Sequence, residues 1–462
     1  MSLLELQPRP CAARDLRAAL GALRASYAPS VIIKTGFSPD QAATDFAAHH
    51  AGMPAQKRIA DEPAVIYRQT AGPDLVFGLY GSETRLRRWM PGLGTGSVTR
   101  AVGALEPIIP RTIADRRRDD AALSLRDLPI SQMTPRDAGP YITMGFVMAG
   151  RSGPALALSA HRMLVLDDTH LGISMLSGRH LRHLAMDSWQ TNTDLPITIN
   201  IGVPPAVAVA SATSTAHMPD GFDKLALAGA LANAPVLISR PGQNPFLPQS
   251  EIVLNGVLTP RECPETLDAR PPGVTMPEFL GYDGQASAPL HVIRVTGISL
   301  RPDAVFQATI GPGLEQSSLL AIGGALTQAF ALAGRGAVAD VADLRYAPSG
   351  GGMLLLFVAL RAAADLNKAR LARGLIETMP FTKTVVFVDD DIDLSSEADV
   401  FWAMTTRCNL AGDCHALDGF PALRMDPSQT KAWSGPGRGA AARCWIDATL
   451  PKSCRRAMRR SF

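Results

Sequence analysis

The sequence predicts a mixed α+β and α/β protein, with a section rich in short strands between two sections that combine helices and strands. Three observations support this fold class. From Pro140 the apolar segments are short and of β type, separated by Gly, Pro and Asp, as in an antiparallel sheet or barrel. After Ile310 strands and helices alternate, which is typical of an α/β layer. With 462 residues, 46% of them apolar, the chain can build two or three domains with cores of their own.

The first hundred residues are expected to contain both helices and strands. The spacing of apolar residues predicts a short amphipathic helix over Asp15–Ala25, and Ser97–Gly103 resembles another. The charged stretch Arg111–Asp137, which contains the run Arg116–Arg118, is interpreted as a linker or surface excursion rather than as a binding site.

The middle section is where a sheet or barrel is expected. Two Ala-rich helices are predicted among its strands, over Pro205–Ala212 and Phe222–Ala232. The apolar alternation slips at Gly297, as at a β-bulge. The predicted strands are Tyr141–Val147, Met163–Leu166, Ile197–Ile201, Glu251–Leu258, His291–Leu300 and Ala304–Ile310.

The last section reads as an α/β layer. A helix over Ser317–Ala333 leads to a strand and then to the triple glycine 350–352. A strand over Met353–Leu360, a helix over Leu366–Thr378 and a strand over Thr384–Val388 follow.

Composition excludes several classes of protein. A net charge of only +3 argues against a nucleic-acid backbone as the main partner. No segment reaches the ~18–20 unbroken apolar residues of a membrane span, because the best run, Leu225–Ile238, is interrupted by Asn233 and Pro235. The first ten residues lack the pattern of a signal peptide. The six cysteines are scattered and form no CxxC pair, which favours reduced thiols in a cytoplasmic protein.

Three short motifs have a structural explanation that is favoured over a functional one. The glycines of 92–96 follow no apolar strand, so a plain turn is favoured over a dinucleotide site. The acidic run Asp389–Asp393 lacks the glycine and the late glutamate of a calcium loop, and a solvated strand end is expected. Cys408 with Cys414-His415 lacks a second pair of ligands to complete a tetrahedral metal site.

A series of short strings runs through the chain from Asp137 to Arg407. They include Asp137–Thr143 (DAGPYIT), His161–Met163 (HRM), Gly178–His180 (GRH), Pro196–Gly202 (PITINIG), Met276–Gly284 (MPEFLGYDG), Gln307–Pro312, Val388–Asp391 and Phe401–Arg407. Taken together and in this order, they resemble the UbiD family of prenylated-flavin decarboxylases. No single string is decisive, but nine or so in the same order are highly specific. The likeness is greatest to the gallate and protocatechuate decarboxylase branch, and it covers most of the chain from about Asp15 to Pro451.

The resemblance implies a domain plan and a cofactor. Residues 1–110 would form an N-terminal α/β region, 111–316 a split β-barrel that binds prenylated FMN, and 317–462 a linker helix with a C-terminal α/β association domain. Such proteins decarboxylate an aromatic or α,β-unsaturated carboxylic acid, with the modified flavin as electron sink. A homodimer or larger homo-oligomer, and a flavin prenyltransferase as supplier of the cofactor, are also implied.

The resemblance assigns roles to individual residues. Glu278 would deliver the proton that replaces the lost carboxylate, and Arg162 would hold Glu278 and tune its pKa. An arginine at Arg179 suits the flavin phosphate, because the guanidinium fork matches phosphate oxygens. Residues expected to contact the cofactor are Ala160, His161, Arg162, Met175, Leu176, Arg179 and His180.

Several positions depart from the family pattern. Mn²⁺ and K⁺ are usual cofactors, but only His180 remains of the usual metal side chains, because Ala157 and Leu237 stand at the partner positions. The acid often found five residues before the proton donor is Gly273 here. Near the substrate, Gln316 and Met353 replace a His and a Lys, which argues against gallate or protocatechuate as substrate. Two readings stay open: an atypical, metal-poor decarboxylase, or a non-catalytic relative that binds flavin or acts as a partner subunit.

Overall fold

The computed structural model divides into two compact units, and each is described by itself. The first comprises residues 1–94, 106–212 and 221–319, and the second comprises 95–105, 213–220 and 320–462. The three-way division at 110 and 316 remains a prediction. The structure describes residues 13–25, 31–52, 61–115, 117, 119–135, 137–150, 156–175, 178–240, 244–265, 274–275, 280–282, 284–285, 289–361, 366–423, 426–429, 443–451 and 453–454.

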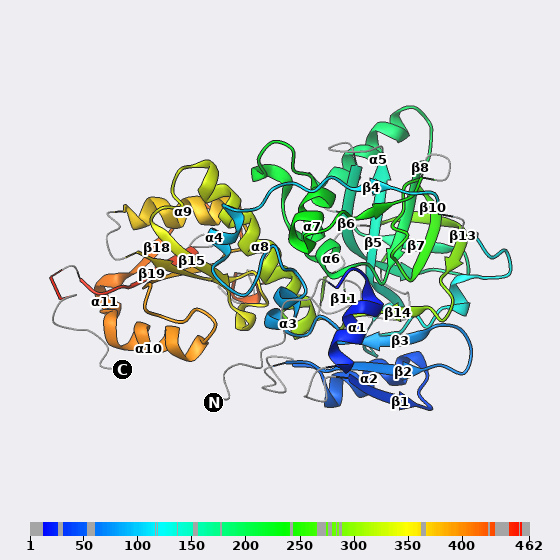
Figure 1. The fold of residues 1–462 in the computed structure, drawn as a ribbon, viewed down its shortest axis with the longest axis horizontal. Helices are drawn as coiled ribbons and strands as arrows, with labels where there is room; N and C mark the ends of the chain where they lie inside the picture. Colours follow the sequence, from blue (N-terminus) through cyan, green and yellow to red (C-terminus); the bar gives the residue numbers. More distant parts are fainter. Residues whose placement is uncertain are drawn as a thin grey trace. The chain divides into compact units, whose positions relative to one another are not determined.

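The first unit is built around a closed barrel of six strands, in the order β10-β13-β7-β6-β5-β8 (Figure 1). All described pairs within it are antiparallel, which confirms the predicted antiparallel barrel. The bulge predicted at Gly297 is also present, because Asn255 pairs with Gly297 while Gly256 pairs with Val295. The barrel strands are β5 (Tyr141–Gly150), β6 (Leu156–Val165), β7 (His170–Ile173), β8 (Leu195–Ile201), β10 (Ile252–Cys263) and β13 (Leu290–Leu300).

Four strands of the first unit form a separate sheet, in the order β1-β2-β3-β14. Its strands are β1 (Val31–Thr35), β2 (Ala64–Arg68), β3 (Asp74–Phe77) and β14 (Val305–Gln307). The strand predicted over Ala304–Ile310 is therefore shorter than expected and pairs in parallel with β3, outside the barrel. Helix α1 (Leu16–Arg24) begins at Asp15, which caps it by accepting from the Ala18 amide at 2.8 Å, and it buries its apolar face.

The remaining elements of the first unit are short. The predicted helices α6 (Pro205–Ala212) and α7 (Lys224–Ala232) are present and buried almost throughout. The charged stretch Arg111–Asp137 carries little regular structure among its described residues, but it is not a surface excursion throughout. Its second half packs into the core through Leu125, Leu128, Ile130 and Met133, so the prediction is wrong there. The other elements are α2 (Pro39–His49), α3 (Glu83–Arg88), β4 (Arg111–Thr112), η1 (Leu125–Asp127), α5 (His180–Gln190), β9 (Leu237–Ile238), β11 (Val274–Thr275) and β12 (Gly284–Gln285).

Helix α8 (Leu314–Gly334) has 21 residues, and it is long and apolar enough to cross a membrane by length and composition alone. The sequence did not reveal this helix as a candidate span, because Ser, Gln and Gly interrupt its apolar run. The mean hydropathy of its most apolar 18-residue window is nevertheless 1.4. However, 83% of its apolar window is buried inside the protein, as in the core helix of a globular fold. One such helix is weak evidence for a membrane span.

Two buried carboxylates join the start of α8 to the N-terminal sheet. Glu62 accepts hydrogen bonds from the backbone amides of Leu314 at 2.7 Å and Glu315 at 3.0 Å. The Glu315 carboxylate in turn accepts from the amides of Gly78 and Tyr80, both at 3.0 Å. Burial raises the pKa of both acids, and raises that of Glu315 to about 7.

The raised pKa of Glu315 predicts a pH-dependent stability. Because the folded protein holds this proton more tightly than the unfolded chain, the contribution of Glu315 is most favourable below pH 4.5 and is lost as the pH rises towards 7. The loss amounts to about 3 kcal/mol. Melting temperatures between pH 5 and 8 should fall more steeply for the wild type than for Glu315→Gln. The exposed Glu106→Gln serves as control and should keep the wild-type slope; equal slopes for all three proteins would contradict the prediction.

The second unit contains a five-stranded mixed sheet in the order β15-β16-β17-β19-β18 (Figure 1). The central strands β16, β17 and β19 are parallel, as strand–helix alternation predicts, and β15 and β18 are antiparallel at the edges. The strands are β15 (Val341–Tyr346), β16 (Leu355–Leu360), β17 (Thr384–Asp389), β18 (Cys414–Leu417) and β19 (Arg443–Ala448). The helices and turns are α4 (Val98–Val102), η3 (Thr215–His217), η4 (Pro348–Gly350), α9 (Lys368–Thr378), α10 (Glu397–Arg407), α11 (Leu410–Asp413) and η5 (Pro427–Gln429).

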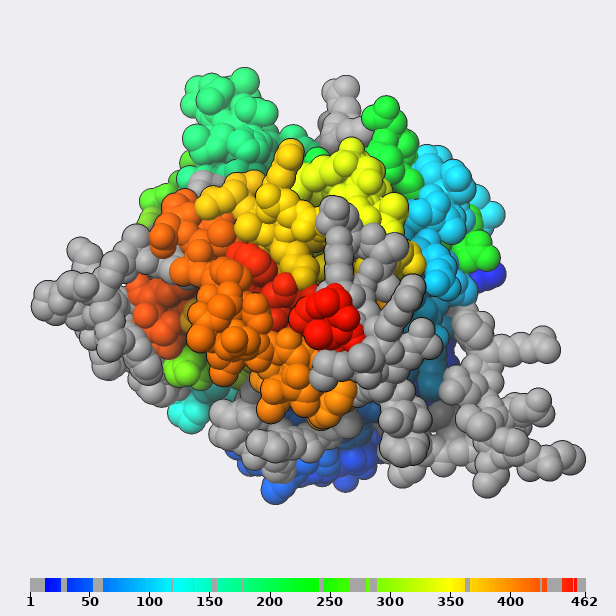
Figure 2. Space-filling view, turned by 90° about the vertical axis from the view of Figure 1, so that its left-hand side faces the viewer, coloured from blue at the N-terminus to red at the C-terminus, as the bar shows by residue number. Residues whose placement is uncertain are grey.

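The acidic run after β17 is not simply a solvated strand end. Arg407, at the end of α10, donates to Asp389 at 2.9 Å and to both oxygens of Asp391 at 2.8 and 2.6 Å. The acidic run was expected to be solvated, but Arg407 pairs with the buried Asp389 and with the exposed Asp391. These ion pairs fix α10 to the sheet. The segment that carries α10 and α11 lies at the surface of this unit (orange in Figure 2), and there Phe401, Trp402 and Leu410 are exposed.

Candidate functional site

The middle of barrel strand β6 is open, although the strand pairs on both sides with β5 and β7. Ala160 is exposed and His161 and Arg162 are partly exposed, whereas both ends of β6 are buried. Successive side chains of a strand point to opposite faces, so neither face of the sheet is completely covered at this place. The polar residues also explain why the sequence predicted only the end of β6, from Met163: they interrupt its apolar pattern.

Arg162 lies opposite a bulge in β5. Ile142 pairs with Met163 and Gly145 with His161, so Thr143 and Met144 together oppose Arg162. The guanidinium donates to both carboxylate oxygens of Glu265, from Nε at 3.1 Å and from Nη2 at 3.3 Å. The Tyr141 hydroxyl donates to the same carboxylate at 3.3 Å. This bidentate pair fixes the direction of the Arg162 side chain.

Glu265 is a site residue that the sequence reasoning missed. Its side chain is only 4% exposed, and Arg162 provides the opposite charge that compensates a buried carboxylate. One signal was available in the sequence. The family acid is missing at Gly273, so a functional Arg162 would need a carboxylate partner from another position. The predicted proton donor Glu278 and the predicted flavin contact Leu176 lie outside the described residues.

His161 holds the loop that follows β7. Its Nδ1 lies 3.0 Å from the carbonyl oxygen of Ser174, and its Nε2 lies 2.8 Å from the hydroxyl of Ser159. Burial lowers the pKa of the imidazole to about 4, so it is neutral at pH 7. A neutral ring that donates from Nδ1 to the carbonyl accepts at Nε2 from the serine. Met175, the next predicted flavin contact along the chain, is buried.

Arg179 and His180 project from the start of helix α5. Gly178 adopts a φ of +81°, a conformation that side chains disfavour, and so turns the chain into the helix. Both Arg179 and His180 are exposed. The Arg179 carbonyl accepts from the His183 amide at 3.2 Å, whereas its guanidinium has no hydrogen bond or ion pair with another residue that the structure describes. Burial, together with the charge of Lys224, lowers the pKa of His180.

Lys224 is a second residue that the sequence reasoning missed. It is the first residue of α7, and its ammonium donates to the carbonyl of Ser211 at 2.6 Å. Burial, with the positive charge of Arg179, lowers the pKa of Lys224 to about 7. The charge of Lys224 also acts on His161 and His180. His161, Arg179, His180 and Lys224 therefore form one group, here named the basic cluster.

The basic cluster fits an anion and does not fit a divalent metal ion. Mn²⁺ requires several oxygen or nitrogen ligands, whereas Ala157 on β6 and Leu237 on β9 provide none from their side chains. Over the described part of the chain, no three His, Cys, Asp or Glu side chains lie close enough together to hold a metal. Cys408, Cys414 and His415 form no such group of three among the described residues, and the His415 ring stacks on Trp445 at 4.0 Å between ring centroids.

Gln316, expected near the substrate, lies in the first turn of α8. Its Oε1 is buried and has no hydrogen-bond partner among the described residues, and the same holds for the Thr309 hydroxyl. The amide of Thr309 donates at 2.9 Å to Thr143, one of the two residues opposite Arg162. Unpartnered buried polar atoms are rare and call for an explanation such as a bound ligand. Met353 belongs to the second unit.

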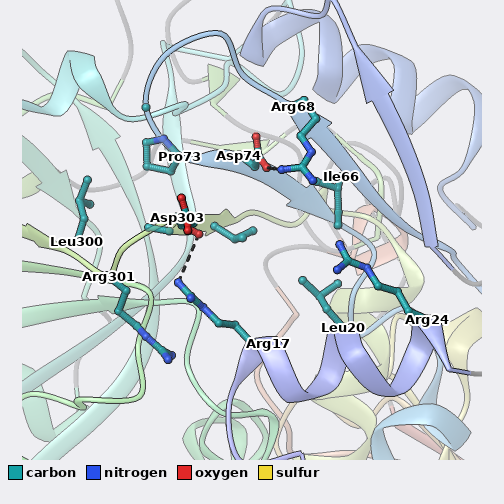
Figure 3. A pocket seen from close by; sticks show the side chains of 13 residues that line it. Arg17, Leu20, Arg24, Ile66, Arg68, Pro73, Asp74, Leu300, Arg301 and Asp303 are labelled. Carbon is teal, nitrogen blue, oxygen red and sulfur yellow. Dashed lines mark hydrogen bonds and ion pairs between the residues drawn. The ribbon is translucent and has the colours of Figure 1, made fainter.

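A separate cavity of about 590 Å³ lies between α1, β2, β3 and the loop before β14 (Figure 3). Arg17, Arg24, Arg68 and Arg301 line it, but carboxylates neutralise most of their charge. Glu251 accepts from Arg17 at 2.9 Å and from Arg301 at 3.1 Å, and Asp74 pairs with Arg68 at 2.6 Å. The Arg17–Glu251 pair ties α1 to the residue that precedes barrel strand β10, and the Arg68–Asp74 pair joins β2 to β3. The cavity contains none of the residues assigned to the site.

Comparison with known proteins agrees with this geometry. Residues 111–314 match the model of the 3-octaprenyl-4-hydroxybenzoate carboxy-lyase Rift-related domain, and 320–448 match that of the C-terminal domain of the same family. The gallate decarboxylase of Lactiplantibacillus plantarum is 31% identical over 430 residues, which cover 87% of this chain and 86% of the relative. The anhydromevalonate phosphate decarboxylase of Archaeoglobus fulgidus is 25% identical over 401 residues, which cover 86% and 87%.

Solved structures share the fold over nearly the whole chain. The apo 3,4-dihydroxybenzoic acid decarboxylase of Enterobacter cloacae superposes with a TM-score of 0.85 at 25% identity and covers 97% of both chains. The UbiD-class enzyme HmfF of Pelotomaculum thermopropionicum, solved in complex with FMN, gives a TM-score of 0.80 at 24% identity with the same coverage. The sequence, the barrel and both family models lead to one conclusion: the chain belongs to the UbiD family of carboxy-lyases.

Proposed function

We propose that this protein is a prenylated-FMN-dependent decarboxylase of an aromatic or α,β-unsaturated carboxylic acid. The observation that carries the proposal is the open middle of β6, where Arg162, held by Glu265, follows His161, on which the charges of Arg179 and Lys224 act. The name of the gallate decarboxylase relative, and the FMN bound to HmfF, support this choice of reaction and cofactor.

The basic cluster supplies the charge that the flavin phosphate needs. A phosphate monoester carries between one and two negative charges at pH 7, and no carboxylate of the described residues acts on Lys224 or His180. When bound, prenylated FMN would act as the electron sink for the cleavage of the carbon–carbon bond. Ala160, His161, Met175 and Leu176 would complete the flavin contacts, with His161 neutral and fixed by Ser174.

The protein's own chemistry is the placement and delivery of one proton. After loss of CO₂ the product carbon must be protonated, and Glu278 is the proposed donor. Arg162, held by Glu265, would orient the substrate carboxylate or Glu278 through its fixed guanidinium. Thr309 and Gln316 offer an uncharged hydroxyl and an uncharged amide oxygen to a ligand. Because Gln316 and Met353 replace a His and a Lys of the family pattern, we propose a substrate other than gallate or protocatechuate.

Purified protein tests the cofactor assignment. After co-expression with a flavin prenyltransferase, we expect flavin absorbance and prenylated FMN by mass spectrometry, at up to one molecule per chain. Arg179→Ala should weaken retention of FMN, because it removes a phosphate partner. Arg126→Ala, which breaks a surface pair with Asp168 in the same unit, is the matched control and should retain the flavin. Protein that carries no flavin by either method would refute the binding proposal.

A second candidate function is a catalytically inactive subunit that binds flavin or a partner. The absence of metal-ligating side chains at Ala157 and Leu237 favours it. Flavin-loaded protein that turns over no acid in a screen of aromatic and acrylic acids would support this alternative. Association of copies through the section after Ser317 is part of either proposal, and the exposed Phe401, Trp402 and Leu410 support it.

A further inference from the structure

We propose that the ammonium of Lys224 takes the place of a metal cation, so that this protein binds the flavin phosphate without a metal. The inference rests on the proposed flavin site and concerns which group neutralises its phosphate. It assigns a role to a residue that neither the sequence reasoning nor the metal pattern of the family identified.

The partners of Lys224 distinguish it from the other described lysines. Lys34, Lys368 and Lys383 each pair with an aspartate at 2.5 Å. Lys224 has no carboxylate partner among the described residues, and its one hydrogen bond goes to the Ser211 carbonyl at 2.6 Å. A partly buried ammonium without a counter-charge is costly, and proteins normally retain such a group only where an anion compensates it.

The neighbours of Lys224 have the same sign of charge or none. Arg179 acts on Lys224, and Lys224 acts on His180, so an arginine, a lysine and an imidazole at the starts of α5 and α7 influence one another electrostatically. With a pKa of about 7, Lys224 is only partly charged at pH 7, and a bound phosphate would favour its charged form. Asp223, the adjacent residue, is engaged elsewhere, because its carboxylate caps α7 through the Ala226 amide at 2.7 Å. An arrangement of this kind repels a divalent cation and attracts a dianion.

The hydrogen bond to the Ser211 carbonyl is a second way in which the Lys224 ammonium resembles a bound cation. Backbone carbonyl oxygens are common ligands of K⁺ and other hard cations. Here the ammonium of Lys224 already occupies that oxygen at hydrogen-bond distance. The ammonium of a lysine has three N–H donors. It can therefore donate one hydrogen bond to this carbonyl and another to a phosphate oxygen.

The test compares FMN with riboflavin, which lacks the phosphate, on the full-length protein by fluorescence titration with and without EDTA. The wild type should prefer FMN equally in both conditions, and elemental analysis should find no stoichiometric metal. Lys224→Met should weaken FMN binding about 10- to 100-fold, the usual worth of one charge-assisted hydrogen bond, and leave riboflavin binding within about 3-fold. Lys34→Met, which removes a lysine charge elsewhere in the same unit, should match the wild type.

Melting temperatures show whether Lys224→Met loses FMN binding because the charge is absent or because the variant is less stable. Without flavin, Lys224→Met should melt no lower than the wild type, because an uncompensated cation has been removed. Adding FMN should then stabilise the variant less than the wild type. A lower melting temperature of the free variant, an unchanged preference for FMN over riboflavin, or a wild-type affinity that falls with EDTA would overturn the inference. A wild type that binds neither flavin would overturn the proposed function itself.

Discussion

Replacement of Glu278 by Gln is expected to reduce decarboxylation by about 10²–10⁴-fold, the usual worth of a positioned proton donor. The substitution keeps the shape of the side chain and removes its acid. Flavin binding should persist, because the basic cluster that we propose for the phosphate lies on other elements, β6 and the starts of α5 and α7. Release of CO₂ from flavin-loaded protein measures the loss, once screening has provided a substrate.

Exchange of solvent deuterium into the product carbon identifies the affected step. It should fall with turnover in Glu278→Gln if the residue delivers the proton. Glu262→Gln is the control, since Glu262 is a half-exposed carboxylate near the end of β10. Should Glu278→Gln retain full turnover and exchange, the proton donor would have to be sought elsewhere.

Local sequence patterns predicted the helices and strands that are determined by residues close together in the chain. Helices α1 and α7 have aspartate caps and continuous apolar faces, so their positions follow from the sequence. The bulge at Gly297 was visible for the same reason, because a glycine breaks the alternation within one strand. The strand order of the barrel follows from no such local signal.

Elements that depend on distant partners were predicted less well. Strand β14 pairs with β3, more than 200 residues earlier, so its apolar residues alone gave the wrong length and the wrong sheet. Strand β6 was seen only from Met163, because its polar middle serves the site rather than the core. The Arg407 pairs with Asp389 and Asp391 were hidden for a similar reason: a charge run does not reveal its counter-ion.

The candidate site shows the same division. Residues in short strings of the family, such as Arg162 and Gly178–His180, could be named from sequence. Glu265 and Lys224 could not, because each acquires its meaning only from a partner that folding brings close, Arg162 for one and the Ser211 carbonyl for the other. Departures from the family pattern at Gly273, Ala157 and Leu237 were nevertheless useful signals. A missing acid or ligand indicates that another residue must supply the charge.

Arg162→Ala is expected to reduce turnover by a factor comparable to that of Glu278→Gln, because the proposed proton donor loses its orienting partner and the control of its pKa. If both residues serve one step, the double variant should be little slower than either single variant. Arg126→Ala, which removes an arginine from another bidentate carboxylate pair, should retain full turnover.

Stability separates this catalytic role from a structural one. Arg162→Ala leaves the Glu265 carboxylate, 4% exposed, with the Tyr141 hydroxyl at 3.3 Å as its one remaining partner among the described residues, so the variant should also melt at a lower temperature. Adding Glu265→Gln removes the uncompensated charge and should restore much of the melting temperature. Turnover should not return with it, because the guanidinium is still absent. If turnover recovers together with stability, Arg162 supports the barrel rather than the reaction, and its proposed role in proton delivery is wrong.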